Sequence, residues 1–408
     1  MLNSFQVALF LTIVITIFFC IVKNKVNSAK VYIVLLLLMA TAGFVFDVQG
    51  AFEFGLCKFE NIALFIILLI FTMYPWIIFD KWLGSNKKIY VSDPGIVVIS
   101  RICVIVIISS IFSIIYVLPY AMRSFALGAG EIRTYLADLK VLPETSLTTF
   151  AVAVGATSPL FVLLFFLTLL DNRLKKYKNW VFLSCFTYIF TSMPFMARDG
   201  YVKLPIMFII NYLIFKNSLD STSLRKIRKY GTVVLSFSVG LILVYSISRF
   251  FTDQQGGYKS FIVGTWGYLF QQPFVFDRTI EMQDNWHTVS MRFPILHQIF
   301  GLGANYEIKR IYDFETMFGT MLSEFYSISG FNSLFAATFI YVCYYAFSIK
   351  RLIAIQNTTG LFLMFMVYLM LEVSGIFFFM YGGISLNYLI LVLSIIPFFV
   401  NKNILYYI

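Results

Sequence analysis

The sequence predicts an all-α, polytopic integral membrane protein of about eleven transmembrane helices, and three observations lead to that prediction. Hydrophobic residues make up 60% of the 408 positions and charged residues only 12%, whereas a soluble domain carries about 25% charged residues. Apolar runs long enough to span a bilayer recur along the whole chain. Basic residues gather in alternate connections between those runs. These features exclude an ordinary soluble domain, and we expect one transmembrane domain over residues 1–408.

Eleven apolar segments have the length and composition of spanning helices. They lie at about residues 5–22, 31–46, 61–79, 95–118, 149–170, 180–196, 201–216, 231–251, 328–348, 359–380 and 385–400. The first segment has no basic stretch before it and no small-residue cleavage site after it, so we expect a retained helix. The segments at 180–196 and 201–216 are short and almost contiguous, which leaves the count open by one helix.

The distribution of Lys and Arg predicts the orientation of the chain. One set of alternate loops holds 19 of the 31 basic residues, and cytoplasmic loops are the ones enriched in Lys and Arg. The basic residues of this side are Lys23, Lys25, Lys30, Lys81, Lys87, Lys88, Arg101, Arg173, Lys175, Lys176, Lys178, Lys216, Arg225, Lys226, Arg228, Lys229, Lys350, Arg351 and Lys402. The acids of the same side are Asp80, Asp93, Asp171 and Asp220. The net charge of +11 is therefore a topology signal, and it gives no reason to propose nucleic-acid binding.

Two long connections fall on the opposite, outer side, at residues 119–148 and 251–314. The second is the largest in the chain and mixes aromatic residues such as Trp286 with amides and acids. Such a mixture suits a carbohydrate, whose faces stack on rings and whose hydroxyls seek polar partners. An interfacial aromatic belt accounts for the number of aromatic residues equally well.

The inner connections are short and contain no nucleotide-binding pattern. No GxxxxGK[ST] or GxGxxG motif follows a strand-like run, which disfavours an ATP-driven pump and a nucleotide-sugar enzyme. The chain has two histidines and five scattered cysteines, without a His/Cys/Asp cluster. We therefore expect neither a protein-bound metal nor a cofactor.

The stretch Met196–Lys203 places three charges between two apolar segments. Gly200 permits a tight reversal of the chain, but a turn has no need of Arg198. Ionisable groups at the edge of a bilayer are costly and are usually retained for a substrate or an ion. We therefore interpret Arg198 as a functional residue, with Asp199 beside it.

Three further arginines lie at or beyond outer helix ends. Arg249 closes the eighth segment, while Arg278 and Arg292 lie in the largest connection. A guanidinium pairs two oxygens of a phosphate at once, so these residues are candidates for binding an anionic substrate. The alternatives are that Arg249 reaches lipid headgroups and that Arg278 pairs with Asp277 in a solvated loop.

Four titratable residues are candidates for proton transfer or for polar contacts within the membrane. His287 and His297 lie in the largest connection, where a loop hydrogen bond is the alternative to a catalytic base. Glu324 stands at the start of the ninth segment, where it is able to face a cavity. Glu372 lies inside an apolar segment and is either a functional acid or a helix-to-helix hydrogen bond.

In layout and in a few local motifs the chain resembles the O-antigen polymerase (Wzy-type) family of bacterial oligosaccharide repeat-unit polymerases. As architecture the resemblance covers most of the chain: ten-odd helices, short basic inner loops and two outer loops, the later one large. The motifs are Arg198-Asp199-Gly200 opening a helix, Ser248-Arg249-Phe250 closing the next, and the stretch Glu315–Gly330. That stretch ends in Ile328-Ser329-Gly330, where the family more often has aspartate before glycine.

The resemblance implies a metal-independent, inverting lipid-linked glycosyltransferase with a GT-C-like fold, in the bacterial inner membrane with its active site facing the periplasm. The growing glycan on undecaprenyl pyrophosphate would be transferred to the terminal sugar of an incoming lipid-linked repeat unit. Membrane lipids and a chain-length regulator protein are the other expected partners.

In this reaction the expected pyrophosphate- or sugar-binding residues are Arg198, Arg249, Arg278 and Arg292. Arg198 and Arg249 are expected to hold the pyrophosphate together, because preorganised arginines stabilise a leaving group without a metal ion. Glu324 is expected to accept the proton of the acceptor hydroxyl, with His287 as the alternative base, and Asp199 to position Arg198.

Two other functions share these features. A flippase or transporter of lipid-linked oligosaccharides has the same composition and needs binding arginines without a base. An O-antigen ligase shares the layout and the chemistry of the polymerase but uses a different acceptor.

Overall fold

The computed structural model describes residues 1–22, 28–52, 54–84, 88–127, 141–195, 199–250, 267–282, 286, 289, 295, 299, 319–375 and 384–407. For residues 199, 245–250, 268 and 384–386 it describes the backbone alone. Within these ranges the chain is overwhelmingly helical, and seven helices are long and apolar enough to cross a membrane. The prediction of an all-α, multi-pass membrane protein is confirmed at this level.

The seven spanning helices follow seven of the predicted segments. They are α1 (Ser4–Val22), the continuous pair α4 (Phe59–Thr72) and α5 (Tyr74–Leu83), α6 (Asp93–Leu127), α8 (Ser146–Leu170), α12 (Ser221–Phe250), α19 (Phe331–Ala354) and α20 (Thr358–Gly375). Three more predicted segments form shorter apolar helices, namely α2 (Ala29–Val45), α11 (Asp199–Phe215) and α21 (Ile384–Ile395), the last running into the 3₁₀ turn η5 (Ile396–Phe398).

The remaining predicted segment, 180–196, is broken into α9 (Lys178–Ser184), α10 (Thr187–Ser192) and the 3₁₀ turn η2 (Met193–Phe195). Hydroxyl groups cause the break, because they compete for backbone partners. Thr187 Oγ1 donates to the carbonyl of Ser184 at 2.8 Å, and the Tyr188 N–H donates to Ser158 Oγ on α8 at 3.1 Å. This segment is therefore not a single spanning helix.

The chain divides into two compact units. Unit 1 comprises Met1–Gly84, Ile262–Arg351 and Val367–Ile395, and unit 2 comprises Ser85–Phe261, Leu352–Met366 and Ile396–Ile408.

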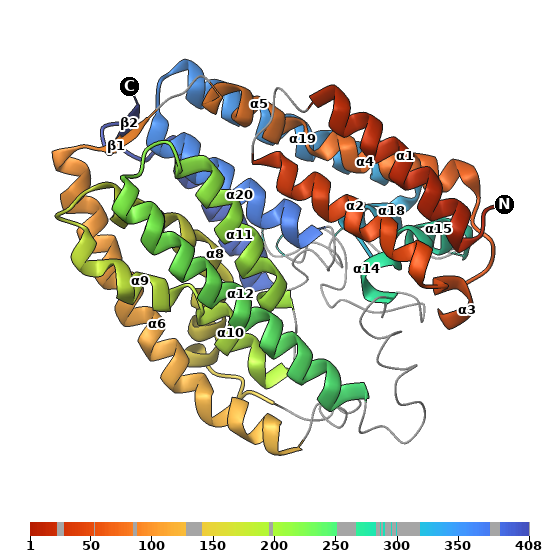
Figure 1. Ribbon diagram of the computed structural model, residues 1–408, viewed down its shortest axis with the longest axis horizontal. Coiled ribbons are helices and arrows are strands. Elements are labelled where there is room, and N and C mark those ends of the chain that lie inside the picture. Colours follow the sequence, from red (N-terminus) through yellow and green to blue (C-terminus); the bar gives the residue numbers. More distant parts are fainter. Residues whose placement is uncertain are drawn as a thin grey trace. The chain divides into compact units, whose positions relative to one another are not determined.

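Unit 1 is built on the antiparallel pair α1 and α2, which lie side by side (Figure 1). Val7, Leu11 and Ile15 of α1 are buried at helical spacing, whereas Ile13 and Ile17 are exposed although apolar. An apolar outer face of this kind is stable only against lipid. The unit also contains α4, α5, most of α19, the end of α20 and α21. Its short helices are α3 (Val48–Phe52), α14 (Tyr268–Phe270), α15 (Gln272–Met282) and α18 (Met321–Ser329).

Gly43 lets α14 approach α2. A Cβ atom at this position would lie 2.2 Å from Cε1 of Phe270, so that no larger residue fits without displacing the ring. Phe270 is fully buried and its ring contacts Phe274 of α15 at 5.2 Å. Part of the connection predicted at 251–314 is therefore helix packed onto the spanning helices.

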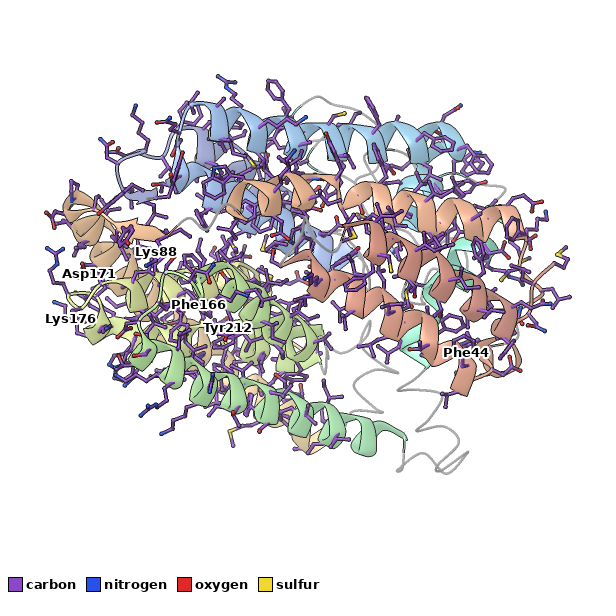
Figure 2. The ribbon with its side chains drawn as sticks, turned by 45° about the horizontal axis from the view of Figure 1, so that its top comes forward. Phe44, Lys88, Phe166, Asp171, Lys176 and Tyr212 are labelled. Carbon is purple, nitrogen blue, oxygen red and sulfur yellow. The ribbon has the colours of Figure 1, made fainter. Side chains whose placement is uncertain are left out.

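Unit 2 has an aromatic core between α8, α9 and α11. Phe165 and Phe166 of α8 meet Phe208 at 5.8 and 5.3 Å, and Phe166 stacks on Phe215 at 5.8 Å (Phe166 is labelled in Figure 2). α8 is buried on every side from Phe161 to Leu169, as expected for a central helix. α6, by contrast, exposes Ile105, Ile108 and Ile115 on one stripe, which suits a lipid-facing helix.

α6 continues to Leu127, past Pro119, where the first outer connection was predicted to begin. Tertiary packing outweighs the proline, which removes one helical donor and crowds the carbonyl of the preceding turn. Ala121 and Ser124 in the extra turns are buried, and Ser124 Oγ donates to the Pro194 carbonyl of η2 at 2.8 Å.

A two-stranded antiparallel sheet was not predicted. β1 (Ile89–Val91) pairs with β2 (Leu405–Tyr407) with Tyr90 opposite Tyr406, and these two rings stack at 5.5 Å. Figure 1 shows the pair beside the C-terminus. The strands are short and far apart in sequence, so no local pattern marks them.

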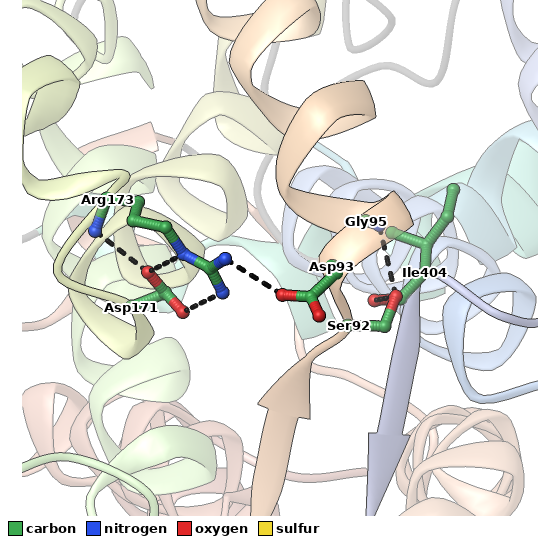
Figure 3. A network of polar contacts seen from close by, with 6 residues as sticks. All are labelled: Ser92, Asp93, Gly95, Asp171, Arg173 and Ile404. Carbon is green, nitrogen blue, oxygen red and sulfur yellow. Dashed lines mark hydrogen bonds and ion pairs between the residues drawn. The ribbon is translucent and has the colours of Figure 1, made fainter.

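The segments predicted to share the cytoplasmic side meet at one end of unit 2. Arg173 pairs with Asp93 at 2.8 Å and with Asp171 at 3.1 Å (Figure 3). The hydrogen bonds and charge of Arg173 lower the pKa of Asp171. Lys175 lies 3.8 Å from Asp220, and Ser92 donates to the Asn403 carbonyl. Lys88 and Lys176 lie at the same end (Figure 2).

Candidate functional site

The predicted site residues with described side chains lie on two short helices of unit 1, α15 and α18, which pack against each other. Neither helix is long enough to span a bilayer, and both follow the eighth predicted segment. α15 begins with Gln272-Pro273, where proline suits the first helical turn because its missing N–H would have no helical partner. Arg278 is on α15 and Glu324 is on α18.

Asp277 fixes α15 onto the start of α4. Its carboxylate is 4% exposed and accepts hydrogen bonds from Asn61 Nδ2 at 2.8 Å and from the Lys58 N–H at 3.1 Å. Burial raises the pKa of Asp277 above its ordinary value. One helical turn later, Glu281 forms a salt bridge with Lys58 Nζ at 3.2 Å. α15 is thus held by a buried carboxylate inside and an ion pair at its edge.

The alternative interpretation of Arg278, an ion pair with Asp277 in a solvated loop, is wrong on both counts. Residues 277 and 278 lie in a helix, and the buried Asp277 carboxylate is held by α4. Adjacent residues of a helix point about 100° apart, so Asp277 faces the core while the half-buried Arg278 does not share its partners. The guanidinium of Arg278 remains a candidate for binding an anion.

α18 has well-defined ends. Thr320 caps its start by accepting a hydrogen bond from the Leu322 N–H at 3.3 Å. Gly330 ends it with a φ of 68°, a left-handed conformation that suits glycine, and its N–H donates to the Tyr326 carbonyl at 2.8 Å. Glu324 is half-buried in the first turn of this helix, so it belongs to a separate short helix before α19.

Tyr326 joins α18 to α15 and to Trp286, which follows α15 in the chain. Tyr326 donates its hydroxyl to the Ile280 carbonyl of α15 at 3.4 Å, and its ring meets that of Trp286 at 5.6 Å. A Cβ atom at Gly330 would lie 3.2 Å from the same tryptophan ring. These contacts bring the helix of Glu324 and the helix of Arg278 into one packed element, which sequence spacing alone did not predict.

The other predicted site residues are placed less completely. Arg198, His287, His297 and Arg292 lie outside the described residues. Asp199 opens α11 and Arg249 is the penultimate residue of α12, and for both only the backbone is described. Lys203, the third charge of the Met196–Lys203 stretch, lies 5.2 Å from the centre of the Tyr188 ring, and Nζ lies 3.4 Å from the Tyr188 hydroxyl.

α11 and α12 are packed neighbours, but the start of α11 and the end of α12 are not level. A Cβ atom at Gly231 would lie 3.4 Å from the Phe208 ring, and counting from this pair places Asp199 about level with residue 240. Arg249 is nine residues further along α12, which corresponds to about 14 Å at 1.5 Å per residue. The start of α11 and Arg249 are therefore separated along the hairpin axis by more than the width of one pyrophosphate.

A second polar cluster of unit 1 surrounds Glu372, which is fully buried in α20. Thr72 Oγ1 donates to Glu372 Oε1 at 2.6 Å, and the Tyr341 hydroxyl donates to Oε2 at 2.9 Å. The Tyr368 hydroxyl donates to the Thr72 carbonyl at 2.7 Å. Both oxygens of Glu372 thus accept hydrogen bonds from neutral hydroxyls, which corresponds to the predicted helix-to-helix hydrogen bond.

Sequence inspection singled out Glu372 but not its partners. Thr72 and Tyr341 come from helices distant in the chain, and only packing reveals their role. Asp80 is a similar case, because it was assigned to an inner loop and is in fact 1% exposed. It accepts from Ser28 Oγ at 2.6 Å and from the Ala29 N–H at 3.0 Å, and so caps the start of α2.

Compared with protein-family models, with curated proteins and with solved structures, the chain matches none of them.

Proposed function

We propose that this protein polymerises oligosaccharide repeat units linked to undecaprenyl pyrophosphate, on the periplasmic face of the bacterial inner membrane. The observation that carries the proposal is the packing of α15 against α18, which brings an arginine helix and a glutamate helix together in one unit. Both helices lie in the region that the sequence assigns to the outer side. The resemblance to the O-antigen polymerases supports the same function.

Arg278 and Glu324 have complementary roles in this reaction. The leaving pyrophosphate develops negative charge, and a preorganised guanidinium stabilises it without a metal ion. The acceptor hydroxyl must lose a proton as it attacks the anomeric carbon, and the half-buried Glu324 carboxylate accepts it. Arg198, Arg249 and Arg292 are proposed as further anion-binding residues, Asp199 as the residue that positions Arg198, and His287 as the alternative base.

The proposed reaction is a single displacement at the anomeric carbon. The hydroxyl oxygen of the incoming repeat unit forms the new glycosidic bond while the bond between the donor sugar and pyrophosphate breaks. Undecaprenyl pyrophosphate leaves, and inversion at the anomeric carbon follows from a single displacement. The lipid tails remain among the apolar helices, and a chain-length regulator is a proposed partner.

The decisive experiment is chain extension in vitro with purified protein and lipid-linked repeat units, followed as a ladder of products. We expect Glu324→Gln to retain substrate binding and to lose most turnover. Glu281→Gln is the matched control, because it removes an equal charge from the neighbouring helix, where Glu281 only pairs with Lys58. If Glu324→Gln extends chains at the normal rate while His287→Ala is inactive, the histidine is the base.

The lipopolysaccharide of a deletion strain distinguishes an O-antigen ligase from a polymerase. Loss of a polymerase leaves single repeat units attached to the lipid core, whereas loss of a ligase leaves polymer that is not attached. We expect the first result.

A transporter of lipid-linked oligosaccharides is the second candidate, and Glu372 is the observation that favours it. A fully buried carboxylate in a spanning helix is a common feature of proton-coupled transporters. The two neutral donors around it fit a structural hydrogen bond as well, and for this reason we rank the polymerase first.

A further inference from the structure

The first turns of α9 and α12 in unit 2 are held side by side by aromatic contacts. The Phe182 ring of α9 lies 4.5 Å from the Tyr230 ring of α12, and just beyond α9 the Phe186 ring lies 5.4 Å from that of Phe237. The Tyr230 hydroxyl also donates to Asn179 Oδ1 at 2.6 Å. Because both contacts advance together along the chain, the two helices run in the same direction and begin at the same end of the unit.

Two lysines lie at that end and are called the lysine pair below. Lys178 precedes Phe182 by four residues, and Lys226 precedes Tyr230 by four. Side chains four residues apart share a face of a helix, so each lysine continues the face that carries the aromatic contact. Lys178 is half-buried and Lys226 is exposed. The two ammonium groups are therefore brought towards each other by the packing of the helices.

The positive charges of the lysine pair repel each other. Partial burial, and with it the charge of Lys226, lower the pKa of Lys178. Neither lysine forms a salt bridge with the part of the chain that the structure describes. An anion between the two ammonium groups would replace the repulsion with two attractions, which favours its binding.

The acids near this end of unit 2 pair with other cations. Three of them form ion pairs with Arg173 or Lys175, namely Asp93, Asp171 and Asp220. Two segments of the same predicted side, 23–27 and 85–87, lie outside the described residues, and their sequences contain three lysines and no Asp or Glu. The lysine pair is therefore available to an anion that the surroundings of the protein supply.

Exposed apolar side chains follow the lysine pair along both helices. Trp180 and Leu183 of α9 are 55% and 43% exposed, and Val233 and Leu235 of α12 are 47% and 55% exposed. Apolar side chains exposed in this way suit acyl chains, and tryptophan is enriched at the level of lipid headgroups. The lysine pair thus lies where a lipid-facing surface meets a charged one, which is the depth of headgroup phosphates.

From these features we infer that the lysine pair binds the phosphate of an anionic phospholipid, in the leaflet that the basic residues assign to the cytoplasm. Anionic lipids of that leaflet attract basic residues at the ends of spanning segments. Each ammonium group offers three donors to the phosphate oxygens, and the exposed residues of α12 offer a surface to the acyl chains. A free phosphate would use the charges alone. The site does not depend on the proposed polymerase reaction, which is assigned to the opposite side of the membrane.

The test is native mass spectrometry of the full chain in an uncharged detergent, with equal amounts of phosphatidylglycerol and phosphatidylcholine that have the same acyl chains. We expect the wild type to bind phosphatidylglycerol in preference to phosphatidylcholine. Lys178→Gln and Lys226→Gln should each reduce this preference about fivefold, the usual contribution of one basic side chain near an anionic lipid surface. The double variant should lose most of the preference.

Two matched variants separate a specific site from an effect of net charge. Lys81→Gln combined with Lys350→Gln removes the same charge from exposed lysines of unit 1 on the same predicted side, and should bind as the wild type does. Lys178→Arg combined with Lys226→Arg keeps both charges and should retain the preference. The lipid site is excluded if the wild type shows no preference or if both glutamine pairs reduce it equally. Displacement of phosphatidylglycerol by an equal concentration of inorganic phosphate would also exclude it, and would indicate a soluble ligand.

Discussion

At the scale of single residues, the buried carboxylates of unit 1 differ in what they hold together. Asp277 connects α15 to α4 through an amide and a backbone N–H, whereas Glu372 connects α20 to two hydroxyls on spanning helices. Each carboxylate accepts hydrogen bonds from two donors. Removing either carboxylate therefore leaves buried donors unpaired, which is the costly part of losing a hydrogen bond.

Asp277→Ala should destabilise the protein by about 1–3 kcal/mol, because Asn61 Nδ2 and the Lys58 N–H lose their acceptor. Glu281→Ala should cost about 0.2–1 kcal/mol, since it removes only an exposed ion pair. Thermal unfolding in detergent measures both. Equal effects of the two substitutions would contradict the structural role of Asp277.

The raised pKa of Asp277 also predicts a pH dependence. The folded protein retains the Asp277 proton at pH values where the unfolded chain has lost it, so the folded state binds more protons. The contribution of this group to stability should therefore fall as the pH rises from about the ordinary value of 3.8 to the raised folded value. Asp277→Asn should remove that part of the dependence, and unfolding curves over this pH range would reveal it. An unchanged slope in Asp277→Asn would show that other groups cause the effect.

Glu372→Gln separates the two candidate functions. Glutamine keeps one acceptor oxygen, and a hydroxyl is able to reverse and accept from its NH₂ group, so that the fold should be retained. A polymerase should then keep nearly normal chain extension, whereas proton-coupled transport should be abolished. Glu372→Ala should instead destabilise by about 1–3 kcal/mol. Glu60→Gln, an exposed acid in the first turn of α4, is the control. Loss of chain extension in Glu372→Gln with intact folding would instead show that Glu372 takes part in polymerisation and is more than a structural acceptor.

At the scale of elements, packing decides where helices end and what their ends present. α6 runs through Pro119 because Ala121 and Ser124 in its last turns are packed inside, while 180–196 breaks because hydroxyls and a Ser158 contact take its backbone partners. α12 extends about nine residues beyond the level at which α11 begins. Local sequence does not make the two helices of a hairpin equal in length. The offset bears directly on the two predicted arginines.

The offset predicts that Arg198 and Arg249 act separately. Each alanine variant should lower chain extension roughly tenfold to a hundredfold, the usual effect of losing a charge-assisted contact. Lysine should be nearly as harmful, because a point charge cannot reproduce the guanidinium fork. The double variant should show the sum of the two free-energy effects within about 0.5 kcal/mol.

A double-mutant cycle in the in vitro assay, with protein abundance matched, measures this additivity. A double variant no worse than either single one would mean that both arginines hold the same pyrophosphate. Arg101→Ala, at an exposed position on α6 in the predicted inner region, is the control for loss of an arginine.

At the scale of the whole molecule, the distribution of charged residues predicts how the chain is oriented in the membrane, and this orientation can be tested. One end of unit 2 gathers Asp93, Arg173 and Asp220 from segments that the basic-residue count assigns to the cytoplasm. A groove lined by Pro143, Thr145 and Phe195, among others, lies at the opposite end of α8. If the orientation is correct, the groove opens to the periplasm.

Cysteine labelling tests that orientation. In a background without the five native cysteines, Lys88→Cys and Lys176→Cys should react with a membrane-impermeant maleimide only after the cells are opened. Ser146→Cys, at the exposed start of α8, should react in intact cells. All three positions are exposed, so the side of the membrane on which each lies, and not its burial, determines whether it reacts. Labelling of Lys176→Cys in intact cells would reverse the predicted topology.

The sequence by itself determined that this is a helical, multi-pass membrane protein and where most of its spanning segments lie. Those properties follow from hydropathy and segment length, which act over about twenty consecutive residues. The same local signals singled out Arg278, Glu324 and Glu372 as charges in costly places.

Only the tertiary structure decided what those charges meet. It brought the helices of Arg278 and Glu324 together, gave Glu372 the hydroxyls of Thr72 and Tyr341, and turned Asp277 away from its neighbour towards Asn61. It also formed the groove from Phe195 and a segment some fifty residues earlier. Such contacts depend on the relative rotation and offset of helices distant in the chain, and composition and periodicity carry no information about either.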